Sequence, residues 1–146
     1  MIAETLVRYV HFMGILVFAS LLVAEHVLLK SQLAKNDMRR LAIIDMAYGI
    51  SALVVLAAGS ALWFWVGKPS GFYTANPVFH AKLTAFVLMG LFSITPTRFI
   101  LRNRKTSEDF IQVPKHIIHL VRAELALLIL IPLLAVFMAR GYGLAS

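Results

Sequence analysis

Four long apolar runs, separated by short polar segments, dominate the pattern of the chain. They cover about residues 5–29, 41–66, 78–101 and 116–139. As α-helices, runs of this length cross a hydrocarbon core about 30 Å thick, whereas membrane barrel strands are about 10 residues long and alternate in polarity. Short connections make consecutive helices antiparallel neighbours. We therefore predict an all-α polytopic membrane protein, with an antiparallel four-helix transmembrane bundle as the single domain of residues 1–146.

Composition agrees with this fold class and excludes others. Of the 146 residues, 60% are hydrophobic and 14% are charged, the mean hydropathy is +0.83, and there is no cysteine. These values exclude a soluble globular protein, a disordered tail and a disulfide-stapled secreted module. The flank before the first run, residues 1–5, lacks the basic residues of a signal peptide. We therefore expect this run to be retained as a membrane span.

The net charge of +7 is explained by where the cations lie. Nine of the fourteen fall in, or at the edges of, the polar segments that follow the first and third runs: Lys30, Lys35, Arg39, Arg40, Arg98, Arg102, Arg104, Lys105 and Lys115. Arg8, Lys68 and Arg140 lie on the opposite side, and Lys82 and Arg122 fall inside runs. The positive-inside rule places the nine in the cytoplasm and both termini outside. Contact with anionic headgroups then accounts for the basic balance without nucleic-acid binding.

Two ionisable side chains lie at similar depth near the outer ends of the first and third runs. His11 is about six residues into the first run, and Lys82 is about four residues into the third. A neutral imidazole inside a helical bundle is a natural axial ligand for haem iron, and a nearby ammonium group suits a haem propionate or an anionic substrate. The alternative is structural: His11 hydrogen-bonds a neighbouring helix, and Lys82 extends toward the interface.

A second set of ionisable residues lies near the inner ends of the runs: Glu25, His26, Asp45, Arg98, His119, Arg122 and Glu124. Because both signs are present, one interpretation is an interhelical ion network that pairs Glu25 and Asp45 with Arg98 and Arg122. The other is a proton path from the cytoplasm through Glu25, Asp45 and His119. Small residues on the second run, including Gly49 and Gly59, allow a neighbouring helix to approach closely.

Three groups of residues resemble the bacterial membrane-bound protoporphyrinogen oxidases of the HemJ type. They are His11, the Arg39-Arg40-Leu41 start of the second run, and the His80-Ala81-Lys82-Leu83 head of the third. The chain as a whole looks closer to an uncharacterised bacterial family of small membrane proteins. That second resemblance rests on residues 76–83, 95–98 and 140–141.

The resemblance implies a haem b protein of the bacterial cytoplasmic (inner) membrane. His11 matches the functional histidine of those oxidases, here a cofactor and metal ligand, and Lys82 matches their functional lysine, here cofactor-binding and catalytic. Oxidation of a porphyrinogen implies a quinone or another respiratory carrier as the acceptor. The chain departs from the pattern in residues 19–26, where the oxidases carry a Pro-Arg pair before a terminal histidine. The resemblance therefore favours haem binding over that particular reaction.

Three functions follow from these patterns. The first is a haem-b membrane oxidoreductase or electron-transfer protein that contacts porphyrin or quinone. The second is a non-enzymatic accessory or assembly subunit of a membrane complex, whose polar layers only fix the helix packing. The third is a small transporter, which with four helices and no inverted repeat requires a homo-oligomer.

Overall fold

The computed structural model describes residues 2–66 and 77–140, which form four long helices. The helices are α1 (Ile2–Leu28), α2 (Lys35–Ala61), α4 (Pro77–Asn103) and α5 (Lys115–Ala139), and a π-helical turn, η1 (Leu62–Val66), continues α2. Each of the four is long and apolar enough to cross a membrane. The structure confirms the predicted all-α, four-span architecture.

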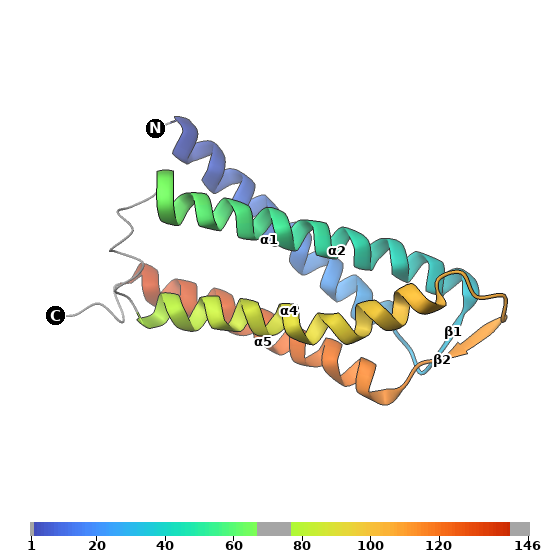
Figure 1. Ribbon diagram of the computed structural model, residues 1–146. Coiled ribbons are helices and arrows are strands. Elements are labelled where there is room, and N and C mark those ends of the chain that lie inside the picture. Colours follow the sequence, from blue (N-terminus) through green and yellow to red (C-terminus); the bar gives the residue numbers. More distant parts are fainter. Residues whose placement is uncertain (1, 67–76, 141–146) are drawn as a thin grey trace.

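The helices pack as two antiparallel hairpins, α1 with α2 and α4 with α5 (Figure 1). The hairpins touch each other less closely than the two helices within each, mainly where α2 meets α4 and α1 meets α5. Both described chain ends lie at one end of the bundle, which we call the open end. The connections between α1 and α2 and between α4 and α5 lie at the other, which we call the sheet end.

A two-stranded antiparallel sheet joins the hairpins at the sheet end, and the sequence pattern did not predict it. β1 (Gln32–Ala34) pairs with β2 (Phe110–Gln112), with Leu33 opposite Ile111. Both of these side chains are buried. Strands of three residues are too short to display an alternation of polar and apolar positions. The pairing also joins segments that are far apart in the sequence, so no local pattern announces it.

The helix α2 begins at Lys35, earlier than the apolar run that starts near residue 41. Its first turns are polar, and Arg40 lies 3.7 Å from Asp37 in an exposed ion pair. The backbone amide of Lys35 donates a hydrogen bond to the carbonyl of Asp109 at 3.1 Å, which ties the start of α2 to the second connection. Hydropathy marks only the part of a helix that lies in lipid, so it leaves out these polar turns.

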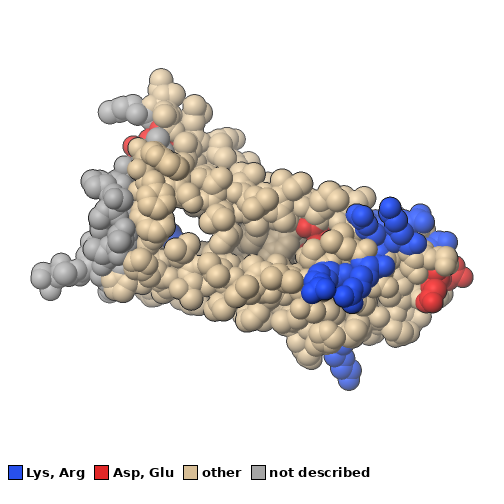
Figure 2. All heavy atoms as spheres, in the orientation of Figure 1, with Lys and Arg blue, Asp and Glu red and all other residues tan. Residues whose placement is uncertain are grey.

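Apolar side chains fill the bundle near the sheet end and also cover its outside. Leu22, Met38 and Ile100 are completely buried, whereas Leu53 and Ile129 are largely exposed. Lys and Arg side chains gather at the sheet end, and the flank of the bundle between its two ends is almost free of charge in Figure 2. An apolar flank with cations at one end is the surface expected of a protein that spans a bilayer.

Candidate functional site

An opening passes between the two hairpins toward the open end of the bundle (Figure 2). Two aromatic contacts cross from one hairpin to the other here. The ring of Trp63, in η1, meets the ring of Phe79 on α4 edge-on, with 4.9 Å between the ring centroids. The ring centroids of Phe18 on α1 and Phe86 on α4 are 5.9 Å apart. Seven residues separate Phe79 from Phe86, which is about 10 Å along a helix. We call the region between these two contacts the interhairpin opening.

His11 lies on α1 at this end and is held against α2. Its Nδ1 is 3.2 Å from the carbonyl oxygen of Val55. Because a carbonyl oxygen only accepts, Nδ1 carries the ring proton in this hydrogen bond, and Nε2 of the neutral ring keeps its lone pair. A Cβ added at Gly59 would lie 3.2 Å from Cε1 of His11. The close approach of the imidazole to α2 therefore depends on a residue without a side chain.

Lys82 lies on α4, between Phe79 and Phe86 in the sequence. Its side chain is half-buried, and Nζ lies over the ring of Phe79, 5.7 Å from the ring centroid. The ammonium group is near enough to His11 to act on it electrostatically. Among residues 2–66 and 77–140, no carboxylate lies within ion-pair distance of Lys82. The structure therefore places His11 and Lys82 in one region at the open end, and the described residues give Lys82 no carboxylate partner there.

A group of three acidic side chains lies deeper in the bundle, on three different helices. Glu25 on α1 is 1% exposed, Asp45 on α2 is 5% exposed, and Glu124 on α5 is 1% exposed. The carboxyl groups of Glu25 and Asp45 lie within hydrogen-bonding reach of each other. The hydroxyl of Tyr48 donates a hydrogen bond to Oε1 of Glu124 at 2.9 Å. We call Glu25, Asp45, Tyr48 and Glu124 the core acid cluster.

The cations expected to neutralise these acids are not in the cluster. Arg98, His119 and Arg122 are exposed, and the described part of the chain pairs none of them with a carboxylate. Arg122 and Glu124 are two residues apart on α5, so their side chains project about 200° apart around the helix. Long basic side chains near the end of a span also reach outward to water and headgroups. The structure thus brings Glu25 and Asp45 together without the expected ion network.

Two members of the cluster were outside the predicted set of site residues. Tyr48 is not among the predicted site residues, although it follows Asp45 by three residues and therefore shares its face of α2. Glu124 belongs to the inner ionisable residues but not to the predicted site. The signal that finds Tyr48 is a hydroxyl side chain on the same helix face as an acidic one, whereas the signal for Glu124 is an acidic residue inside an apolar run.

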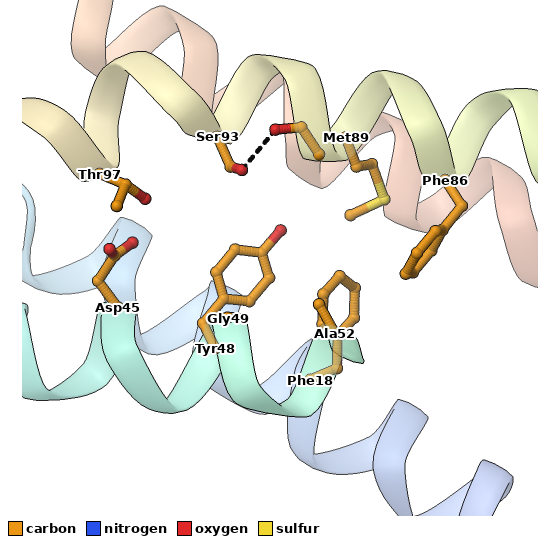
Figure 3. A pocket seen from close by; sticks show the side chains of 10 residues that line it. Phe18, Asp45, Tyr48, Gly49, Ala52, Phe86, Met89, Ser93 and Thr97 are labelled. Atoms are coloured by element: carbon orange, nitrogen blue, oxygen red, sulfur yellow. Dashed lines mark hydrogen bonds between the residues drawn. The ribbon is translucent and has the colours of Figure 1, made fainter. Parts of the chain in front are cut away.

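A cavity of about 80 Å³ connects the core acid cluster with the aromatic residues nearer the open end (Figure 3). Asp45, Tyr48, Ser93 and Thr97 contribute polar groups to its lining; the remaining walls are Phe18, Gly49, Ala52, Phe86, Met89 and Gly90. In Figure 3 the side chain of Asp45 faces that of Thr97 across the gap between α2 and α4. No group of three or more His, Asp or Glu side chains in the described ranges could hold a metal ion on its own.

Comparison with known proteins identifies the family but no characterised relative. No curated protein and no solved structure matches the chain. The resemblance to the HemJ-type oxidases therefore stays a prediction. A family described as predicted membrane protein (DUF2214) matches residues 3–143, almost the whole length. The chain belongs to this family of membrane proteins.

Proposed function

We propose that this protein binds haem b in the interhairpin opening and acts as an electron-transfer protein or oxidoreductase of the bacterial cytoplasmic membrane. The orientation of His11 carries the proposal. Histidines that ligate metals usually donate one ring N–H to a carbonyl or carboxylate, which fixes the tautomer and directs the other nitrogen at the metal. The hydrogen bond from Nδ1 of His11 to the carbonyl of Val55 has this form, and it makes Nε2 the ligand atom.

Lys82 supplies the second part of the proposed site. A half-buried ammonium group with no carboxylate in reach among residues 2–66 and 77–140 favours an anionic ligand, and a haem propionate is such a ligand. Its position on the opposite hairpin from His11 would let the two residues hold one flat molecule from two sides. We assign Lys82 to binding of the carboxylate and, if the ligand is a porphyrinogen, to catalysis at that site.

An imidazole and an ammonium group, from His11 and Lys82, suit a haem, and the size of the available hollows limits where its macrocycle would lie. Pockets for cofactor-sized ligands are roughly 300–1,000 Å³, so the cavity of about 80 Å³ next to the core acid cluster is too small. We place the macrocycle in the interhairpin opening, between the Trp63–Phe79 and Phe18–Phe86 contacts, because His11 and Lys82 lie at that end. Aromatic rings on both sides suit a flat π-system.

Bound haem would supply one-electron chemistry. The chain would orient it through His11, neutralise a propionate through Lys82 and exclude water with the aromatic contacts. Following the positive-inside rule, we place the sheet end in the cytoplasm and the open end, with the haem, toward the outer face. A membrane carrier such as a quinone would reach this site from the lipid.

An absorption spectrum of the full-length protein, purified in detergent from haem-supplied cells, tests the proposal. We expect a haem band that shifts on reduction and is lost in His11→Ala. The matched control is His80→Ala, at an exposed histidine of the same end, which should keep the band. Lys82→Met should weaken haem retention without abolishing it. A colourless wild-type protein, or a band that survives His11→Ala, overturns the assignment.

The same purified protein distinguishes between the two alternative functions, an accessory subunit and a transporter. A colourless protein that co-purifies with a larger membrane complex would favour the accessory-subunit function. Ion flux into liposomes that depends on Glu25 or Asp45 would favour the transporter function, in an oligomer.

A further inference from the structure

The core acid cluster has no role in the proposed haem site, and one of its atoms lacks a partner. Oε2 of Glu25 is buried and has no hydrogen-bond partner among the described residues, in a side chain that is 1% exposed. The residue points into the cluster, where it interacts with both Asp45 and Glu124. A buried oxygen without a donor is costly for the fold, so a bound proton, water or ion that supplies one would lower this cost.

The helices that pack around Glu25 present acids and hydroxyls to it, and no counter-charge among the described residues. α2 presents Asp45 and Tyr48, α5 presents Glu124, and α4 presents the hydroxyl of Thr97. The cations near these positions, Arg98 and Arg122, are exposed. The cluster in the described structure therefore contains acids and hydroxyls only. Two adjacent ionised carboxylates in such a place would repel each other with nothing to offset the loss of hydration.

One proton shared by the two carboxyl groups would answer both the missing hydrogen-bond donor and the repulsion between two ionised carboxylates. It supplies the missing donor at the Glu25–Asp45 pair and takes away one negative charge, as in other pairs of adjacent carboxyl groups that share a proton. A metal ion fits less well, because the described acids do not form a group that could hold one.

The cavity gives this pair a route to water. Asp45 lies in its lining, together with Ser93 and Thr97. A volume of about 80 Å³ has room for several water molecules, since each needs about 10–15 Å³ by this measure, and the polar lining supplies hydrogen-bond partners. The cavity runs from Asp45 to Phe18 and Phe86, which border the interhairpin opening.

We propose that Glu25 and Asp45 form a proton-binding site that holds one proton between their carboxyl groups and exchanges it with water in the adjoining cavity. The site goes beyond haem binding and does not depend on it. It gives the protein a place inside the bundle where a proton is held and released.

Infrared spectroscopy of the wild-type protein at neutral pH tests for the proton directly. We expect the C=O stretch of a protonated carboxyl group, which shifts in D₂O. Labelling the glutamates with ¹³C in one sample and the aspartates in another should shift the same band in both, because the proton is shared. Absence of the band overturns the proposal, as does a band that responds to only one of the two labels.

Variants assign the band to the pair. Glu25→Gln and Asp45→Asn should each remove it, whereas Glu4→Gln, at a half-buried acid that pairs with Arg8 far from the cluster, should leave it unchanged. Glu124→Gln keeps an oxygen for Tyr48 to bond and should also leave the shared-proton band in place. A band that persists in both pair variants contradicts the proposal. If these variants do not fold, the wild-type labelling still decides.

A further pair of variants tests the route. Gly90 lies in the lining of the cavity and a Cβ there meets nothing within 4 Å, so Gly90→Leu adds a large side chain at the cavity wall without a clash. We expect slower appearance of the D₂O shift than in wild type. The matched control is Ala57→Leu, at an exposed position on α2, which should leave the rate unchanged. An equal rate in all three proteins overturns the proposed exchange through the cavity.

Discussion

The hydroxyl of Tyr48 donates a hydrogen bond to Oε1 of Glu124 across 2.9 Å, and this bond joins the two hairpins in the interior of the bundle. Both side chains are buried, Tyr48 at 5% and Glu124 at 1% exposure. The same tyrosine ring packs against Phe18, 4.7 Å away between centroids. Tyr48 therefore connects the aromatic contacts of the opening to the core acid cluster.

Removing this hydroxyl should destabilise the bundle. Tyr48→Phe leaves the buried Oε1 of Glu124 without its donor, which costs about 1–3 kcal/mol. Unfolding in detergent, followed by circular dichroism, measures the loss. Tyr9→Phe, at a tyrosine that is 62% exposed, is the matched control and should change little. Equal stability of the two variants would show that the Tyr48–Glu124 bond contributes nothing.

Close packing of α1 on α2 should depend on Gly14. A Cβ at this position would lie 3.0 Å from Cγ2 of Val55, so Gly14→Ala should push the helices apart and lower stability by about 1 kcal/mol or more. Gly49→Ala, where a Cβ meets nothing within 4 Å, is the control and should be neutral or stabilising, because alanine favours helix over glycine. Similar unfolding midpoints for both variants would contradict this packing.

The sheet should hold the two connections together through its buried face. Leu33→Ala removes a side chain that is 1% exposed and should cost about 2–5 kcal/mol. Gln112→Ala, on the exposed face of the same sheet, should have little effect. Limited proteolysis of the two connections, compared between the two variants, measures the loss of local stability at the sheet end. If Leu33→Ala is cut no faster than Gln112→Ala, the pairing does not stabilise this end.

The orientation in the membrane can be tested with single cysteines, since the chain has none of its own. Glu108→Cys lies at the sheet end and Ile2→Cys at the open end, and both positions are exposed. In intact cells a membrane-impermeant thiol reagent should label Ile2→Cys only, and after lysis it should label both. The reverse pattern would place the sheet end outside and contradict the positive-inside assignment.

The four helices were predictable because lipid imposes a simple rule: a long apolar run must be helical, since only a helix satisfies its own backbone there. The observed helix boundaries differ from the predicted ones where a helix extends beyond its apolar run. The helix α2, for example, begins in polar residues at Lys35. The pairing of β1 with β2 escaped prediction because it depends on a contact between two distant connections. Equal depth of His11 and Lys82 followed from counting residues along the two runs.

By contrast, only the packing of the helices shows which face of each helix points into the bundle. Glu25, Asp45, Arg98 and Arg122 lie at comparable depth in the sequence, which made ion pairs a reasonable prediction. In the structure the acids turn inward and the arginines outward. The apolar sequence thus determined how many helices cross the membrane and which residues lie at each depth, because the position of a residue within an apolar run sets its depth in the bilayer. Only the tertiary structure decided which side chains meet, because that depends on how each helix is rotated against its neighbours.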